Sequence, residues 1–271
     1  MKFFIDTANL EQIKEANDLG ILDGVTTNPS LMAKEGIKGT EAVMKHYVDI
    51  CEMVEGDISA EVISTDFDGI VAEGLKLAAL HKNIVVKVPM IKDGIKAIKY
   101  FTDKGIRTNC TLIFSAGQAI LAAKAGATYV SPFIGRIDDM GADGVELIYQ
   151  IRRIFDIQGY KTEILAASIR NALHIIKCAE AGADVCTCPL DSILGLLKHP
   201  LTDSGLAKFF GNSLYIPADF KEEKVSVKIM LKEDNSKFKE FDIYIKKMED
   251  PPLKTQAEII AEIKNKRKKN S

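Results

Sequence analysis

Eight apolar, β-rich segments alternate with amphipathic segments from the first residues to about position 210. Alternation of this kind predicts parallel strands, because each helix returns the chain to the same edge of the sheet. The predicted strands are Phe3–Asp6, Gly24–Thr27, Ile58–Ile63, Ile84–Val88, Ile106–Thr111, Thr128–Ser131, Glu163–Ala167 and Asp184–Thr187. The predicted helices are Leu10–Leu19, Thr40–Val54, Phe67–Leu80, Ile95–Lys104, Ala116–Ala125, Val145–Phe155, Arg170–Glu180 and Ser192–Leu197.

Eight parallel strands fit either a closed barrel or an open, doubly wound sheet. The open sheet usually carries a glycine-rich loop after its first strand. Here the first predicted strand continues into Thr7-Ala8-Asn9, which contains no glycine. Eight repeats also match the (βα)8 count of a TIM barrel. We therefore predict an α/β protein with a TIM-barrel catalytic domain over residues 1–210.

The sequence pattern changes after residue 210. Val225–Leu231 and Phe241–Lys246 are predicted strands joined by a polar turn at Glu233–Ser236, and a helix is predicted to begin at Thr255. We predict that residues 211–271 form a small α+β C-terminal appendage with two strands and a helix. The sequence gives no role for it.

Charge and hydropathy exclude several classes of protein. The chain has 36 basic and 38 acidic residues, for a net charge of −2, so no nucleic-acid partner is expected. The basic run Lys264–Lys269 is compatible with nucleic-acid binding or targeting, but a solvated chain end is the simpler interpretation. No apolar run is long enough to span a bilayer, and no signal peptide is recognisable at the start. We expect a cytoplasmic protein without a membrane partner.

Cysteines and histidines give no metal motif. The five cysteines, an odd number, lie in apolar segments and are predicted to be free thiols. Cys186 and Cys188 would face the same way on a strand, but two thiols without further ligands make a poor zinc site. The four histidines are scattered. We expect no metal.

Polar side chains occur where seven of the eight predicted strands end. The active site of a βα barrel lies at these C-terminal ends. A polar side chain inside a barrel is costly unless it is paired, so these residues predict one shared polar pocket. The alternative is that some of them point outward or lie in loops. They are Asp6, Asn28, Glu61, Lys87, Thr111, Ser131 and Ser168.

Lys87 interrupts the otherwise apolar strand Ile84–Val88, and Val85 and Lys87 would share its inner face. Lysine is rarely buried without a partner or a purpose. Burial favours the neutral amine, which is the form that attacks a carbonyl to give a Schiff base. The alternative is a structural lysine paired with Glu61 or Asp6. The same two carboxylates are the candidate proton carriers of a Schiff-base reaction, and both interpretations can hold together.

A second cluster of polar residues follows the sixth and seventh predicted strands. Arg136 lies after the sixth strand, and Ser168 and Arg170 come directly after the seventh. One arginine can bind two phosphate oxygens at once through two parallel hydrogen bonds. A serine hydroxyl and the backbone amides at a helix N-terminus add further hydrogen-bond donors. Either arginine alone could instead form a surface salt bridge. The presence of both arginines at one mouth of the barrel favours a phosphate site.

At these residues the sequence resembles the transaldolase family, particularly its short, single-barrel branch, which includes fructose-6-phosphate aldolases. The resemblance covers about residues 1 to 210. Several long motifs in the right order are far more specific than one short pattern. The motifs are Phe4-Ile5-Asp6-Thr7-Ala8, Gly24-Val25-Thr26-Thr27-Asn28-Pro29-Ser30, Val85-Val86-Lys87-Val88-Pro89, Ser131-Pro132-Phe133-Ile134-Gly135-Arg136-Ile137-Asp138 and Leu165-Ala166-Ala167-Ser168-Ile169-Arg170.

The resemblance implies a barrel enzyme that exchanges a dihydroxyacetone unit between phosphorylated keto- and aldo-sugars without a cofactor. It implies that Lys87 is the Schiff-base lysine and that Asp6 handles the proton at the cleaved bond. The remaining implied roles are contacts with substrate hydroxyls by Asn28 and Ser131, a catalytic water held by Glu61 and Thr111, and phosphate binding by Arg136, Ser168 and Arg170. The resemblance also implies a homo-oligomer, a pentamer or decamer, although the short branch lacks a segment like 211–271.

Two positions bear on whether the three-carbon unit is transferred or released. The fructose-6-phosphate aldolases that resemble this chain carry Gln where it has Glu61 and Tyr where it has Phe133. Phe133 has no hydroxyl and cannot help deliver protons to the bound intermediate, which would then wait for an acceptor aldehyde. We therefore expect a transaldolase. The alternatives are an aldolase that releases free dihydroxyacetone and a non-enzymatic sugar-phosphate binder.

Overall fold

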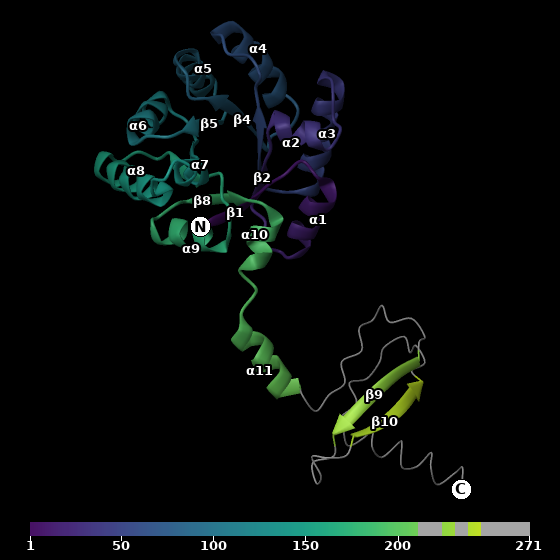
Figure 1. Cartoon of the computed structure of the whole chain (residues 1–271). Helices are drawn as coiled ribbons and strands as arrows, with labels where there is room; N and C mark the ends of the chain where they lie inside the picture. The colour runs from purple at the N-terminus through teal and green to yellow at the C-terminus, as the bar shows by residue number, and fades with distance from the viewer. Residues whose placement is uncertain (211–223, 231–237, 245–271) are drawn as a thin grey trace. The chain divides into compact units, whose positions relative to one another are not determined.

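The computed structural model describes residues 1–210, 224–230 and 238–244, and its larger part is a closed barrel (Figure 1). All eight strands pair in parallel with their neighbours, and the last pairs with the first, with Lys2 opposite Val185. This confirms the predicted TIM barrel. The strands are β1 (Lys2–Asp6), β2 (Gly24–Thr26), β3 (Asp57–Glu61), β4 (Ile84–Pro89), β5 (Thr108–Ile113), β6 (Tyr129–Pro132), β7 (Glu163–Ala166) and β8 (Val185–Cys188).

Helices surround the barrel, as Figure 1 shows. Side-chain caps begin several of them, and Gly126, with a φ of +95°, ends α6 in the left-handed conformation that suits glycine. The helices are α1 (Leu10–Asp18), α2 (Pro29–Lys34), α3 (Thr40–Met53), α4 (Phe67–Ala78), α5 (Lys92–Asp103), α6 (Ala116–Ala125), α7 (Ile134–Asp138), α8 (Gly144–Gln158), α9 (Ala172–Glu180) and α10 (Leu190–Gly195).

Several of these helices begin or end a few residues away from their predicted bounds. The predicted helix Arg170–Glu180 begins only at Ala172, because the side chain of Asn171 caps it by accepting a hydrogen bond from His174 N at 3.0 Å. Arg170 therefore lies in the loop before α9. The short helices α2 and α7 were not predicted. α2 follows from Asn28, which caps it, and from Pro29, whose fixed φ suits a first helical position.

The interior of the barrel is apolar below its C-terminal end. Alternate strand residues form a compact cluster there, which includes Phe4, Val85, Tyr129, Leu165 and Val185. The larger core lies between the strands and the surrounding helices. All five cysteines are buried free thiols, as predicted. Within the part of the chain that the structure describes, no helix combines the length and apolar character needed to cross a membrane.

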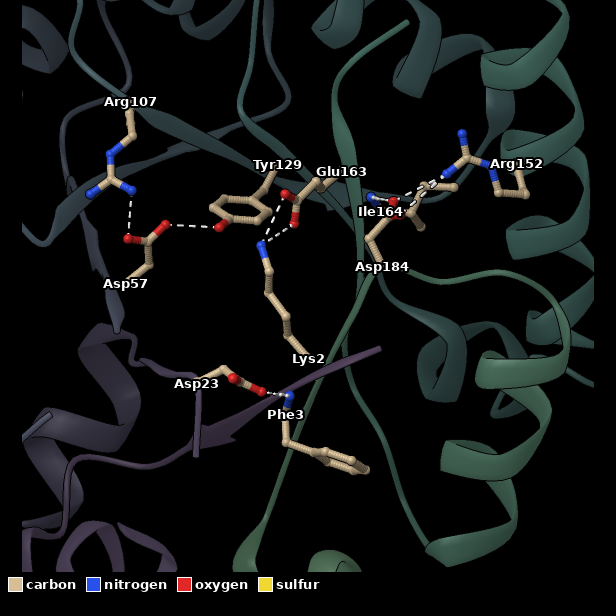
Figure 2. A network of polar contacts seen from close by, with 10 residues as sticks. All are labelled: Lys2, Phe3, Asp23, Asp57, Arg107, Tyr129, Arg152, Glu163, Ile164 and Asp184. Atoms are coloured by element: carbon tan, nitrogen blue, oxygen red, sulfur yellow. Dashed lines mark hydrogen bonds and ion pairs between the residues drawn. The ribbon is translucent and has the colours of Figure 1, made fainter. Parts of the chain in front are cut away.

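Ion pairs and hydrogen bonds occupy the N-terminal end of the barrel (Figure 2). Arg107 Nη1 lies 2.5 Å from Asp57 Oδ1, and Tyr129 Oη donates to Asp57 Oδ2 at 2.8 Å. Lys2 Nζ lies 2.9 Å from Glu163 Oε2. Since these charged groups satisfy one another, the opposite end of the barrel is the place to look for a reactive site.

The chain divides into two compact units, Met1–Leu197 and Lys198–Ser271. Helix α11 (Pro200–Phe210), which we assigned to the barrel domain, falls in the second unit, and the domain division at residue 210 stays a prediction. In that unit β9 (Lys224–Met230) and β10 (Phe238–Tyr244) pair antiparallel and overlap the predicted strands. The predicted turn at Glu233–Ser236, the helix from Thr255 and the basic run Lys264–Lys269 lie outside the described residues.

Candidate active site

A cavity of about 340 Å³ lies at the C-terminal ends of the barrel strands. Eight of the ten predicted site residues line it, and a ninth, Glu61, joins it through Lys87. Thr111 does not line it. The lining residues are Asp6, Thr26, Asn28, Lys87, Ser131, Phe133, Arg136, Ala167, Ser168, Ile169, Arg170, Thr187 and Pro189.

Lys87 projects from β4 into this cavity, and only 6% of the residue is exposed. Its Nζ lies 3.0 Å from Glu61 Oε2 and donates a hydrogen bond to the backbone oxygen of Thr27 at 3.0 Å. The pairing with Glu61, which the sequence suggested as a structural alternative, is therefore present. Lys87 nonetheless lines the cavity, so the pairing with Glu61 leaves it accessible to a ligand.

Asp6 ends β1 and faces the same cavity. Its Oδ1 accepts a hydrogen bond from Thr26 Oγ1 at 2.8 Å, and Thr26 Oγ1 lies 2.6 Å from Thr187 Oγ1. Burial raises the pKa of the Asp6 carboxyl, while the charge of Lys87 and the Thr26 hydrogen bond act in the opposite direction. A carboxyl group in such surroundings holds a proton more readily than an ordinary aspartate, which suits a proton carrier.

A chain of buried hydrogen bonds fixes Ser131 at the end of β6. Ser131 Oγ donates to Asn109 Oδ1 at 2.7 Å, and Asn109 Nδ2 donates to Ser59 Oγ at 3.1 Å. On the other side of the cavity, Asn28 Oδ1 accepts from Leu31 N at 3.0 Å as the cap of α2. Both predicted hydroxyl-binding residues are thus held in one orientation by their neighbours.

Thr111, like Glu61, does not line the cavity directly. The pairing of β5 with β6 shifts between Cys110 and Ile113, and Leu112 between them has a φ of +63°. Thr111 is 1% exposed, and its Oγ1 has no hydrogen-bond partner among the residues that the structure describes. A buried hydroxyl without a partner is costly to a folded protein. Its predicted partnership with Glu61 around a water stays a prediction.

Arg136 provides exposed positive charge at the mouth of the cavity. It lies on α7, and its guanidinium carbon is 5.1 Å from the centre of the Phe133 ring. It forms no ion pair within residues 1–210, 224–230 and 238–244. A guanidinium that rests on an aromatic ring and has no carboxylate beside it is suited to an anionic ligand.

Arg170 and Ser168 lie in the loop between β7 and α9, beside Arg136 at the mouth. Gly135 N donates to Ser168 O at 3.2 Å, and a Cβ on Gly135 would lie 2.1 Å from that oxygen, so the close approach requires glycine. Arg170 Nη2, however, lies 2.6 Å from Asp139 Oδ2. Both arginines line the same cavity, but an anion must compete with Asp139 for Arg170.

Five lining residues were not predicted. The hydroxyls of Thr26 and Thr187 occupy the inner faces of β2 and β8, and strand alternation could have identified both. The others offer no polar side chain: Ala167, Ile169 and Pro189. Across the described ranges of the chain, no group of three or more His, Cys, Asp or Glu residues is arranged to hold a metal ion.

Comparison with known proteins agrees with this architecture. The family model for transaldolase/fructose-6-phosphate aldolase matches residues 3–250. A "probable transaldolase" of Parabacteroides distasonis is 71% identical over 212 residues, which cover 78% of this chain and 97% of the relative. The corresponding protein of Phocaeicola vulgatus is 70% identical over 212 residues, with coverage of 78% and 97%. That of Porphyromonas gingivalis is 69% identical over 209 residues, with coverage of 77% and 95%. The chain belongs to the transaldolase/fructose-6-phosphate aldolase family.

Proposed function

We propose that this protein is a transaldolase that carries a dihydroxyacetone unit on Lys87. The donor would be sedoheptulose 7-phosphate or fructose 6-phosphate, and the acceptor erythrose 4-phosphate or glyceraldehyde 3-phosphate, an exchange of the pentose phosphate pathway. The observation that carries the proposal is the buried amine of Lys87, which lines a polar cavity with Asp6 and lies 3.0 Å from Glu61. The family and the names of its relatives point the same way.

The reaction begins when the neutral amine of Lys87 attacks the ketone carbon of the donor. The resulting carbinolamine loses water and becomes a protonated imine. A base then removes the proton from the hydroxyl of C4, and the C3–C4 bond breaks. Its electron pair moves into the imine and leaves an enamine on Lys87, while the rest of the sugar departs as an aldose phosphate. Attack of the enamine on an acceptor aldehyde and hydrolysis of the imine complete the transfer.

Two carboxyl groups divide the proton transfers in this scheme. Asp6 takes the proton from the C4 hydroxyl and returns one to the alkoxide that forms when the acceptor is attacked. Its raised pKa strengthens its affinity for that proton. Glu61, in contact with the amine, moves protons as water is expelled and returned, with Thr111 as partner for that water. Asn28 and Ser131 bind the hydroxyls of the sugar chain.

The phosphate of both substrates would lie at the cavity mouth, against Arg136, Ser168 and Arg170. Binding there exchanges the contact of Arg170 with Asp139 for a contact with phosphate. A phosphate at the mouth and an amine at the base fix the sugar chain between them.

Phe133 favours transfer over release. Its side chain lines the cavity and offers no hydroxyl to deliver a proton to the enamine. The alternative is a fructose-6-phosphate aldolase, in which the enamine is protonated and leaves as dihydroxyacetone. An assay with and without an acceptor aldose phosphate separates the two, because fast turnover without acceptor would support the aldolase.

Trapping with borohydride tests the proposal directly. Wild-type protein is incubated with fructose 6-phosphate and borohydride, and the modified peptide is identified by mass spectrometry. We expect an adduct on Lys87 and none in Lys87→Arg, whose guanidinium stays protonated and cannot form the imine. Lys82→Arg, at an exposed neighbouring lysine, is the matched control and should behave as wild type. Wild-type turnover in Lys87→Arg would refute the mechanism, and a phosphate-binding protein with no adduct would support the non-enzymatic binder.

The assembly and location of the protein are part of the same proposal. We propose a cytoplasmic homo-oligomer, a pentamer or decamer as the family resemblance implies. Light scattering of the full chain measures the subunit number.

A further inference from the structure

We propose that Tyr47, a residue outside the cavity, is a positioning residue for the Lys87 amine. The inference rests on the proposed function, since it concerns how well that amine is placed for attack. Tyr47 lies on α3 and is 2% exposed. It does not line the cavity.

The phenol of Tyr47 joins two chain segments that lie at the ends of neighbouring strands. Its Oη accepts a hydrogen bond from Thr27 Oγ1 at 3.1 Å and another from the backbone N–H of Glu61 at 3.2 Å. Thr27 follows β2, and Glu61 ends β3. One oxygen atom on a helix therefore fixes the spacing of two strand ends.

Those two residues are the ones that hold the amine. Lys87 Nζ donates to the backbone oxygen of Thr27 at 3.0 Å and lies 3.0 Å from Glu61 Oε2. No other polar partner of the amine occurs in the region that the structure describes. Tyr47 therefore binds both residues that contact the amine, but through different groups. It binds the side-chain hydroxyl of Thr27, whose backbone oxygen contacts Lys87, and the backbone amide of Glu61, whose carboxylate contacts Lys87.

Proton transfer by Tyr47 itself is a poor explanation for this arrangement. Burial raises the pKa of the Tyr47 hydroxyl, so it stays protonated at neutral pH. The side chain also has no access to a ligand in the cavity. What the phenol can do is limit the movement of Thr27 and Glu61, and through them fix the direction in which the amine points.

The alternative is a purely structural role, in which the hydroxyl only stabilises the fold by anchoring α3 to the barrel. Tyr129 offers a matched control for that alternative. It is also buried, at 3% exposure, and its Oη donates to Asp57 at 2.8 Å at the opposite end of the barrel. Tyr47→Phe and Tyr129→Phe each remove one buried, hydrogen-bonded hydroxyl, but only the first removes it from the partners of Lys87.

Both variants of the full chain are compared with wild type by melting temperature, steady-state kinetics and the rate of borohydride trapping with fructose 6-phosphate. We expect both to lose thermal stability. We expect Tyr47→Phe alone to lower kcat and the trapping rate together by about tenfold or more, with KM changed by no more than about twofold, because a small displacement of a reacting group costs rate. Tyr129→Phe should keep both rates within about twofold of wild type.

The outcomes separate this inference from the proposed function. Absence of a Lys87 adduct in wild type would remove the proposed function itself. A normal wild-type adduct with equal trapping rates in the two variants would overturn the role of Tyr47. If Tyr47→Phe does not fold, Thr27→Val replaces it, since it removes the hydroxyl bound to the phenol and keeps the carbonyl bound to Lys87. A severalfold loss of trapping rate is expected there, and an unchanged rate would equally overturn the inference.

Discussion

The Nζ atom of Lys87 lies 3.0 Å from Oε2 of Glu61, and only 7% and 17% of the two side chains are exposed. Removal of one partner of such a pair leaves the other charge buried without compensation. The contact therefore contributes to folding as well as to chemistry, and the two contributions can be separated by mutation.

Glu61→Gln tests the folding contribution. We expect the free energy of unfolding to fall by about 2 kcal/mol, because the amine keeps a neutral acceptor but loses its counter-charge. Lys87→Met in the Glu61→Gln background should recover most of that loss, because neither charge of the pair then remains. Urea unfolding of both single variants and the double variant measures the coupling. Additive losses in the double variant would show that the two side chains do not interact.

Arg136→Ala tests the phosphate site. A charge-assisted hydrogen bond to phosphate contributes about 1.5–3 kcal/mol, so KM for fructose 6-phosphate should rise by about 10- to 100-fold. Unphosphorylated fructose, which makes no such contact, should be affected far less. The measurement is steady-state kinetics with both sugars.

Arg153→Ala is the matched control for this variant, because Arg153 is an exposed arginine on α8 that does not line the cavity. It removes the same charge and should leave both KM values near those of wild type. Equal losses for the two sugars in Arg136→Ala would remove Arg136 from the phosphate site.

Sequence pattern predicted most of the site because strand alternation fixes which side chains face inward. Lys87 and Ser131 follow this rule, and both line the cavity. Thr111 does not line the cavity, and the left-handed backbone of the next residue, Leu112, interrupts the regular strand there. No local pattern in the sequence predicts that irregularity.

Contacts between distant segments were beyond prediction for a different reason. Asp139 pairs with Arg170 across 31 positions, and the phenol of Tyr47 reaches strand ends from a helix outside the barrel. Such contacts depend on the packed arrangement of side chains, which periodicity does not encode. The start of α9 was also missed, although Asn171 is an ordinary cap residue that the sequence displays.

Phe133→Tyr tests the basis of transfer against release. A phenol at this cavity position could deliver a proton to the enamine, so release of dihydroxyacetone from fructose 6-phosphate without acceptor should rise about tenfold or more. A coupled assay for free dihydroxyacetone measures it. Phe114→Tyr is the control, since the Phe114 ring packs edge-on against Phe133 at 5.7 Å but does not line the cavity. If both variants leave release unchanged, Phe133 does not decide the outcome.

Asp6→Asn tests the cost of burying the Asp6 carboxylate. Burial raises the pKa of this group above its ordinary value of 3.8, so the folded protein holds the proton more tightly than the unfolded chain does. The ionised group therefore lowers stability above its folded pKa, and this penalty is absent below 3.8, where both states are protonated.

Asparagine at position 6 cannot ionise and can still accept a hydrogen bond from Thr26. We expect Asp6→Asn to lose activity but to gain on the order of 1 kcal/mol at pH 7, with the gain shrinking as the pH falls towards 4. Urea unfolding between pH 4 and 8 measures the difference in free energy of unfolding between the variant and wild type. Asp18→Asn, at an exposed aspartate, is the control. A gain that grows towards acid pH would mean that the carboxylate, rather than the carboxylic acid, is the form favoured by its surroundings.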